Sequence, residues 1–554
     1  MYTFVNRYSN SICHIYYDKD GNKRISKNSK NLNLMLGVET NEESNWKNMY
    51  GDNIQKVTCD TLGEYYKFIK EYGDYELIYG NINPVAQFIS NKYADEEVTD
   101  LSHIKTFIVD IETTSIIWDF KKAILIGYEK DFEESSSLMG YVQINDMFTK
   151  NEQKQLVYRD GDKLKPYNRQ IFIRQAGFPD PEKTEYPIIT IAIKNEKNGK
   201  HYVCSTKDYD KSKTVLNIDP KDIQFYKAKD EEHLFRWFIS IMRKEKPDIL
   251  IGWYSNNFDW PYIINRSRVV FGSLDEISKI SPFGVVSCEK TDISFGFGDT
   301  EWRIVVGGIT MLDYLKLYKK FIFTPREKYS LDFISEEELG SNKIKYDEYG
   351  NLNDLWDQNP QLFMDYNIYD VELISMMDKK LKLLDILASL AYKAKCNFYD
   401  ALGTVGIWDI IIYNRLKKKN IMIPPSKENE SESYAGAYVK QPIPDIYSWI
   451  ISLDLNSLYP FIQKQFNISP ECLTDEREMV RIDQIDYNIL FQDIKPKEGL
   501  ILAGNGCYFK KDKVGFIPEI LMEIYDERKE AKKLMIQKKI ELEAIENQLK
   551  GVIK

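Results

Sequence analysis

The chain has 554 residues, of which 43% are hydrophobic and 29% charged, so it is too long for a single hydrophobic core and predicts several domains. Its formal net charge of −10 weighs against a simple nucleic-acid coat, because such proteins gain affinity by neutralising phosphates. Seven scattered cysteines without a C-x-x-C pair, and no apolar run near the roughly 18 residues of a membrane span, indicate a cytoplasmic protein with neither structural zinc nor a membrane partner.

The first part of the chain, residues 1 to about 104, alternates short β-rich runs with turns rich in Asn, Lys and Gly. We expect strands at 2–8 and 11–17 and an amphipathic helix near 62–72. The pattern predicts a small mixed domain. Its residue types indicate no chemistry.

Two acids follow in the run Phe107-Ile-Val-Asp-Ile-Glu112. Apolar residues on both faces favour a central strand, and side chains two apart on a strand point the same way, so Asp110 and Glu112 would face one spot. These carboxylates are candidates for a metal pair that hydrolyses phosphodiesters, which requires at least two further acids. The alternative is a partly exposed strand with two solvated acids.

Candidates for the further acids lie in two later segments. Asp259 follows an apolar run at 248–253 and precedes the helix-like segment that begins with Pro261. Its ordinary structural role would be to cap that helix, and the two roles can coexist. Tyr366 and Asp370 lie four residues apart in a helical segment and therefore share a face, although surface acids on a core helix would give the same pattern.

The hairpin candidate lies between these acids, where 285–306 carries β formers around the glycine-rich run at 295–299. Helix is predicted from about residue 364 through about 394. Farther on, Ile450, Ile451 and Leu453 predict a buried strand that delivers Asp454 before a sharp turn at Ser457-Leu-Tyr-Pro460. An isolated buried carboxylate is costly unless a cation or a donor meets it, so Asp454 either binds a cation or caps the turn.

The last segment, from Pro518 onward, predicts one long helix. Arg528 and Lys532 lie four residues apart on it and share a face, where the arginine fork suits a phosphate. A solvated basic stripe is the alternative.

Taken together, the motifs resemble those of family B DNA polymerases. Asp-Ile-Glu at 110–112, Asn256-Asn-Phe-Asp259 and Tyr366-x-x-x-Asp370 are similar, in this order, to the family's three exonuclease motifs. Tyr434-Ala-Gly-Ala-Tyr-Val-Lys440 and the run from Asp454 to Pro460 resemble its first palm motif, in a form similar to that of T-even phages. The segments 307–321 and 329–332 extend the resemblance.

The fold class that this resemblance implies is α/β multidomain, with a ribonuclease-H-like 3′-5′ exonuclease domain and a partial palm and fingers. The expected divisions are an amino-terminal domain at 1–104, the exonuclease domain at 105–381, a return to the amino-terminal domain at 382–427, a partial palm at 428–514 and the first fingers helix at 515–554. The polar span 116–175 does not align with the family's motifs and is expected to be an insertion of unknown purpose. The hairpin at 285–306 resembles the one that helps to part primer from template, although a merely structural hairpin remains open.

The family's site roles transfer residue by residue. The resemblance implies metal binding by the side chains of Asp110, Glu112, Asp259, Asp370 and Asp454 and by the carbonyl of Leu455, with two Mg²⁺ in each active site, for which Mn²⁺ can substitute. It implies that Tyr366 orients the attacking water. It implies nucleotide binding by Ser457, Leu458, Tyr459, Arg528 and Lys532.

The family's second fingers helix, second palm carboxylate, thumb and clamp-binding tail have no match in the 554 residues. We therefore expect one part of a split polymerase from a phage-infected cell, completed by a second polypeptide that also provides contact with the sliding clamp. The expected partners are primer-template DNA, a single-stranded 3′ end and deoxynucleoside triphosphates. A truncated chain and a stand-alone 3′-5′ exonuclease with a polymerase remnant are the alternatives.

Overall fold

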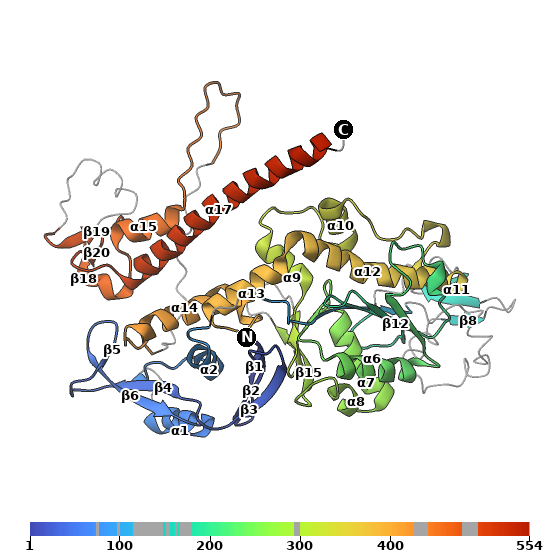
Figure 1. Ribbon diagram of the computed structural model, residues 1–554, viewed down its shortest axis with the longest axis horizontal. Coiled ribbons are helices and arrows are strands. Elements are labelled where there is room, and N and C mark those ends of the chain that lie inside the picture. The colour runs from blue at the N-terminus through green and yellow to red at the C-terminus, as the bar shows by residue number, and fades with distance from the viewer. Residues whose placement is uncertain are drawn as a thin grey trace. The chain divides into compact units, whose positions relative to one another are not determined.

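The computed structural model describes residues 1–73, 77–96, 100–114, 148–150, 156–160, 163–166, 179–292, 300–425, 441–478 and 497–552. The chain forms two compact units (Figure 1). The first comprises Met1–Asn48 and Asn53–Lys427, and the second comprises Met49–Asp52 and Glu428–Lys554. Among the described residues, no helix combines the length and the apolar character that crossing a membrane requires.

The first unit opens with two small antiparallel sheets and two helices. One sheet has the order β1-β2-β3 and the other β4-β6-β5. Their bounds are β1 (Tyr2–Tyr8), β2 (Ser11–Tyr17), β3 (Lys23–Asn28), β4 (Leu34–Glu39), β5 (Trp46–Lys47), β6 (Asn53–Cys59), α1 (Leu62–Tyr72) and α2 (Pro84–Lys92). Thr61 and Glu64 cap the start of α1 reciprocally, and Gly73 ends it with a φ of 76°. The predicted strands at 2–8 and 11–17 and the helix at 62–72 are confirmed.

A six-stranded mixed sheet follows, with the order β13-β12-β11-β7-β14-β17. Its strands are β7 (Thr106–Thr113), β11 (Ile188–Asn195), β12 (His201–Ser205), β13 (Ile223–Lys227), β14 (Ile249–Ile251) and β17 (Thr310–Met311). The central strand β7 pairs antiparallel with β11 and parallel with β14. A central strand covered on both sides, as predicted for 107–112, is confirmed.

Helices cover both faces of this sheet. Phe107, Val109 and Ile111 pack into a core that includes residues of α6 (Glu231–Glu245) and α7 (Asp259–Phe271). Ile108 points the other way, into a core that includes residues of α12 (Pro360–Leu381). The alternation of β7 therefore turns its even-numbered residues, Asp110 and Glu112 among them, toward α12.

Further helices complete the first unit. They are α8 (Asp275–Ser278), α9 (Tyr314–Phe321), α10 (Leu331–Leu339), α11 (Leu352–Gln358), α13 (Leu383–Ala394) and α14 (Thr404–Lys418). The helices α12 and α13 confirm the prediction of helix through about residue 394. The predicted hairpin is also present, because β15 (Val286–Asp292) pairs antiparallel with β16 (Thr300–Val306). Its glycine-rich turn lies outside the described residues.

Within the expected insertion at 116–175, the structure describes only three short antiparallel strands. They are β8 (Phe148–Lys150), β9 (Leu156–Asp160) and β10 (Lys163–Pro166). They form a sheet of their own, with the order β10-β9-β8. The rest of the expected insertion lies outside the described residues.

A buried carboxylate joins the amino-terminal strands to the six-stranded sheet. Asp248, which is 0% exposed, accepts hydrogen bonds from the Thr3 hydroxyl at 3.1 Å and the Tyr17 hydroxyl at 2.7 Å. It also accepts from the backbone N–H of Lys105 at 2.8 Å and pairs with the Lys23 ammonium at 2.7 Å. A charge buried this deeply is tolerable because every contact is a donor.

The second unit holds a short helix, a small sheet and a long helix. Their bounds are α15 (Leu458–Phe466), β18 (Leu473–Arg477), β19 (Leu500–Leu502), β20 (Cys507–Lys510) and α17 (Phe516–Val552). The predicted long helix is confirmed. Glu471 fixes the start of α17, because its side chain accepts from the Phe516 N–H at 2.7 Å. Farther along the helix, the ring centre of Tyr525 lies 5.0 Å from that of Phe461 on α15.

The buried strand predicted before Asp454 is wrong. Residues 450–455 form no strand, and Ile450, Ile451 and Leu453 are 77%, 83% and 89% exposed. The sequence pattern describes a segment that needs strands on both sides, and the described residues provide no strand that pairs with it. The segment Tyr434–Lys440, which carries part of the palm resemblance, lies outside the described residues.

Candidate functional site

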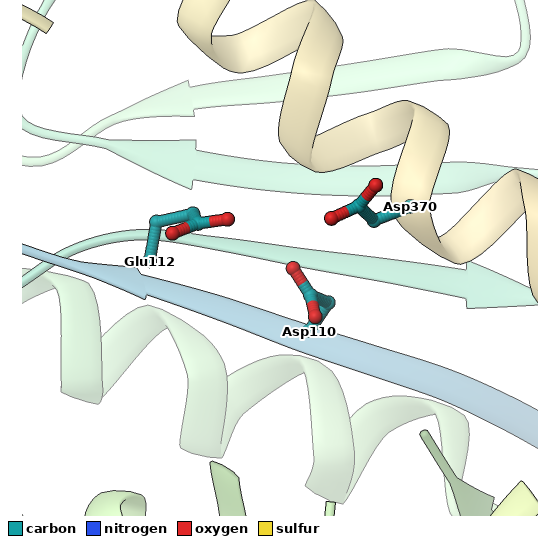
Figure 2. A group of neighbouring side chains, drawn as sticks. All are labelled: Asp110, Glu112 and Asp370. Carbon is teal, nitrogen blue, oxygen red and sulfur yellow. The ribbon is translucent and has the colours of Figure 1, made fainter. Parts of the chain in front are cut away.

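Three carboxylates gather where β7 faces α12. Ligand oxygens of Asp110, Glu112 and Asp370 lie within 4.8 Å of one another. Figure 2 shows the first two rising from the strand and the third descending from the helix toward them. The period of two along β7 and the packing of α12 on that face of the sheet bring the three together.

Asp259 approaches the same strand from the start of α7. Its Oδ1 accepts a hydrogen bond from the backbone N–H of Ile111 at 3.2 Å, so it lies beside the residue between the two strand acids. The predicted role as N-cap is wrong, because Phe258 occupies the cap position and Asp259 is the first helical residue. The boundary moves by one residue because the turn at 254–258 enters the helix directly.

The turn before Asp259 is held by a further buried acid, Asp313. Its carboxylate accepts from the backbone N–H groups of Tyr254 at 3.1 Å and Asn256 at 3.2 Å, and also from Leu315 at 3.0 Å. The first two donors fix the path of the chain from β14 into α7, and the third caps the start of α9. Asp313 thereby helps to position Asp259.

Burial raises the pKa of all four acids, and the charges of neighbouring acids add to the rise for Asp110 and Glu112. Burial, followed by the charges of Asp259, Asp370 and Glu112, raises the pKa of Asp110 well above its usual range. Burial and the neighbouring charges of Asp370 and Asp259 raise the pKa of Glu112 to about 8, although the Lys343 ammonium opposes the rise. Burial likewise raises the pKa of Asp259 to about 8 and also raises that of Asp370. Without a cation, the site resists full ionisation.

Lys343, from the segment between α10 and α11, reaches into this cluster. Its Nζ pairs with Asp370 Oδ2 at 2.5 Å and donates to the Tyr366 hydroxyl oxygen at 3.0 Å. Burial opposes its charge, yet Asp370, Tyr366 and Asp110 together raise the lysine pKa well above its usual value. The ammonium therefore stays charged beside the acids, and the Tyr366 O–H proton remains free to donate elsewhere.

A buried amide on α12 holds the Asp110 carboxylate. Asn367, which is fully buried on α12, donates from Nδ2 to Asp110 Oδ2 at 2.6 Å. The Thr190 hydroxyl on β11 donates to the amide oxygen of Asn367 at 3.2 Å. This chain of bonds fixes the amide orientation and thereby the rotation of the Asp110 carboxylate.

The donor set fits divalent metal ions. All the gathered groups offer carboxylate oxygens, which Mg²⁺ and Mn²⁺ prefer. Asp370 Oδ1 is buried and has no hydrogen-bond partner among the described residues, so one oxygen of this carboxylate is unsatisfied. Such an oxygen is costly unless a cation or a donor meets it.

The predicted polymerase residues lie in the second unit and are open to solvent. Asp454 and Leu455 belong to the exposed segment, and Asp454 is not part of any metal-competent acidic group among the described residues. Ser457 precedes α15 with a φ of 50°, and Leu458 and Tyr459 begin that helix, 42% and 73% exposed. The sharp turn predicted there is confirmed.

Arg528 and Lys532 are both exposed on α17. Their spacing places them on one face of the helix, as the sequence indicates. Their phosphate-binding role stays a prediction.

Sequence reasoning missed three positioning groups: Lys343, Asn367 and Asp313. Lys343 lies in an irregular segment where no period signals its direction. Asn367 was open to detection, since it follows Tyr366 directly in the quoted motif and a buried helix residue beside two functional ones is a natural candidate. Asp313 lies inside the 307–321 resemblance, where no catalytic acid was expected.

Comparison with known proteins identifies relatives for both units. Residues 150–334 match the model of the exonuclease domain of DNA polymerase family B, and residues 407–552 match the model of DNA polymerase family B. Asp259 lies inside the first match, whereas Asp110, Glu112 and Asp370 lie outside it. Asp454, Arg528 and Lys532 lie inside the second.

Three curated relatives illustrate the likeness. The DNA-directed DNA polymerase of Escherichia phage RB69 is 31% identical over 378 residues, which cover 65% of the chain and 41% of the relative. The DNA-directed DNA polymerase of Enterobacteria phage T4 is 28% identical over 564 aligned residues, which cover 98% of the chain and 55% of the relative. DNA polymerase 1 of Pyrococcus abyssi is 24% identical over 64% of the chain and 41% of its own length. The chain spans about half the length of the relatives it matches.

Proposed function

Because the chain carries a family B exonuclease domain and part of a family B polymerase domain, we propose that it is the amino-terminal part of a DNA-directed DNA polymerase with 3′-5′ proofreading exonuclease activity. The exonuclease would remove mispaired nucleotides from a single-stranded 3′ end of primer-template DNA. The observation that carries this proposal is the gathering of Asp110, Glu112 and Asp370 within 4.8 Å, with Asp259 bonded to the same strand.

In the exonuclease step these four acids would hold two Mg²⁺, for which Mn²⁺ can substitute. When bound, the ions would lower the pKa of a water molecule and offset charge on the phosphate. The Tyr366 hydroxyl, whose oxygen already accepts from Lys343, has its proton available to orient that water or a phosphate oxygen. The Lys343 ammonium would stabilise the negative charge that develops on the phosphate, so no side chain need act as nucleophile.

The nucleotidyl-transfer site would use Asp454 and the Leu455 carbonyl as metal ligands. Ser457, Leu458, Tyr459, Arg528 and Lys532 would bind the deoxynucleoside triphosphate. One carboxylate cannot hold two cations against a triphosphate, so we propose that a second polypeptide supplies the remaining acid and the rest of the polymerase. The exposure of Ile450, Ile451 and Leu453 around Asp454 supports this proposal, because such apolar residues are expected to be covered.

The second polypeptide would also provide any contact with a sliding clamp, and the assembly would act in the cytoplasm of a phage-infected cell. The relationship to the T4 and RB69 polymerases supports this setting. The alternative is a stand-alone metal-dependent 3′-5′ exonuclease with a polymerase remnant. One observation favours the stand-alone exonuclease: Asp454 lies in an exposed segment and belongs to no cluster of acids that could hold a metal ion among the described residues.

The experiment uses the purified chain, Mg²⁺ and a labelled primer-template, scored on one gel for shortening and extension. We expect the chain alone to shorten the primer and the Asp110→Asn variant to leave it intact. Adding a candidate carboxy-terminal polypeptide with nucleotides should convert shortening into extension. Shortening in every lane would favour the stand-alone nuclease, and an inactive chain in Mg²⁺ and Mn²⁺ alike would overturn the exonuclease assignment.

A further inference from the structure

A buried ion pair joins α12 to the six-stranded sheet two residues after Asp370. The Glu372 carboxylate on α12 accepts from the Lys194 ammonium on β11 and from His201 Nε2 on β12, the latter at 2.8 Å. Both bonds end on the same oxygen, Oε2. The side chains of Lys194, His201 and Glu372 are 4%, 2% and 15% exposed, so the charges are almost fully withdrawn from water.

Stability alone does not account for charges in this place. Withdrawing two ions from water is costly, and apolar side chains of similar volume often hold two elements together as well or better. An ion pair differs from an apolar contact because its donor and acceptor meet in one geometry, whereas an apolar contact can slide. The pair between Lys194 and Glu372 therefore fixes where α12 lies on the sheet.

A second polar contact on β11 lies on the other side of Asp370 along the helix. Asn367 accepts from the Thr190 hydroxyl at 3.2 Å, whereas Glu372 accepts from Lys194. Thr190 and Lys194 lie four residues apart on one face of the strand, and Asn367 and Glu372 lie five residues apart on the helix, about 7.5 Å along its axis. Two contacts at this separation fix both the translation and the rotation of the helix segment that carries Asp370.

The pairing of β11 with β7 relates these two contacts to the strand acids. In this register Thr190 lies opposite Glu112, Ala192 opposite Asp110 and Lys194 opposite Ile108. The contacts of α12 on β11 therefore lie on either side of the level of Asp110. Figure 2 shows Asp370 facing the strand acids from the helix. Ionised carboxylates this close repel one another, so their separation has to be held by contacts outside the cluster.

We propose that Lys194 and Glu372 are positioning residues of the acidic cluster. Their ion pair holds α12 where Asp370 and the two strand acids can bind the same metal ions, and His201 holds the Glu372 carboxylate in the required orientation. Neither Lys194 nor Glu372 is one of the proposed ligands, so both act through Asp370. The inference rests on the proposed function, because it takes the cluster to be a metal site.

Replacing Lys194 by methionine separates the effect of position from that of charge. Removal of a cation near an acidic cluster should by itself strengthen the binding of a metal cation. Loss of the contact with Glu372 should weaken it, because Asp370 is no longer held at the level of Asp110. The two effects have opposite signs, so weaker metal binding reports the change in position.

The experiment measures Mn²⁺ binding by the full chain without DNA, by calorimetry and by the electron paramagnetic resonance signal of the free ion, well below the Tm of each variant. Lys194→Met should weaken Mn²⁺ binding about tenfold, which is the low end for groups that orient metal ligands. Lys23→Met is the matched control, because Lys23 pairs at 2.7 Å with another buried acid, Asp248, where β3 meets the chain before β14. It should lower Tm and leave Mn²⁺ binding unchanged.

A double variant, Lys194→Met with Glu372→Met, distinguishes positioning from stability. It removes both charges together, so it leaves no unpaired buried ion and no change in net charge. Its Tm should equal or exceed that of the parent chain, because an apolar pair replaces the ions. Its Mn²⁺ binding should remain weak, because two methionines do not fix the helix. If Lys194→Met fails to fold, the double variant still decides.

Three results would overturn the inference: Mn²⁺ binding by the double variant equal to that of the parent, stronger binding by Lys194→Met, or equal weakening in Lys23→Met. A parent chain that binds Mn²⁺ but does not shorten a primer would instead overturn the exonuclease assignment and leave the positioning role in place. A parent chain that binds no Mn²⁺ would overturn both.

Discussion

Replacing Lys343 by methionine tests whether its ammonium acts in the exonuclease site. Methionine keeps an unbranched stem over the Tyr366 ring, where the lysine Nζ lies 4.9 Å from the ring centre. It removes the 2.5 Å ion pair with Asp370 and the 3.0 Å bond to the Tyr366 hydroxyl. The change therefore deletes one charge and two contacts while preserving most of the packing.

The magnitude follows from these contacts. At an effective dielectric constant of ~20, two unit charges 2.5 Å apart attract by about 7 kcal/mol, most of which is cancelled by the cost of desolvating them. Loss of one donor that stabilises developing charge typically costs about 3–4 kcal/mol in the transition state, or a rate loss of about 10²–10³. We expect a fall of this size in kcat, with a smaller change in KM, because the ammonium acts on charge that builds during the reaction.

Single-turnover shortening of a labelled single-stranded oligonucleotide measures this effect at saturating Mg²⁺. Lys345→Met is the matched control, because Lys345 is exposed in the same segment and should retain full activity. Lys343→Arg should recover part of the rate, since the charge remains. A Lys343→Met rate within about threefold of the parent rate would refute the reasoning and reduce Lys343 to a structural partner of Asp370.

Three further predictions address the supports of the site. Asn367→Ala should raise the Mg²⁺ concentration for half-maximal exonuclease activity about 10–100-fold, because the 2.6 Å bond to Asp110 is lost; an unchanged Mg²⁺ titration would contradict this. Glu112 and Asp259 have raised pKa values of about 8, so the folded metal-free protein binds their carboxyl protons more tightly than the unfolded chain does. The protonated carboxyls therefore stabilise the fold fully at low pH, and this contribution is lost as the pH rises through about 8. Mg²⁺ should therefore raise Tm more at pH 8.5 than at pH 6, and Glu112→Gln should reduce that difference. Asp248→Ala should lower the free energy of unfolding by about 3–5 kcal/mol in urea titrations, whereas Asp208→Ala, at an exposed ion pair, should cost less than about 1 kcal/mol.

Much of the proposed exonuclease site could be predicted because its spacing is set by regular secondary structure. The period of two on β7 places Asp110 and Glu112 on one face, and the strand is apolar enough to identify as central. The i, i+4 relation of Tyr366 and Asp370 likewise follows from helix geometry. The sequence could not predict that Lys343 contacts Asp370, since this lysine reaches the acids from a segment without regular structure.

The failed prediction at 450–454 has a different physical cause. An apolar run reports the environment that a segment requires and not whether the chain provides it. Ile450, Ile451 and Leu453 have the pattern of a buried strand, yet the described residues offer no strand to pair with them. Secondary structure in a sheet depends on neighbours distant in sequence, so a local pattern can be correct about preference and wrong about the observed state.

The two candidate sites therefore differ in how completely the described residues form them. The acids of the proposed exonuclease site, with Lys343, Asn367 and Asp313, all come from one compact unit, and their contacts are already made within it. Asp454 and its apolar flank are exposed, and among the described residues Asp454 joins no group of acids that could hold a metal ion. Under the proposed function, cleavage at a 3′ end should therefore be seen with the chain alone, and nucleotide addition should be seen only when a second polypeptide is added. Because the two activities differ in this requirement, one gel that scores both distinguishes a missing partner from a misassigned site.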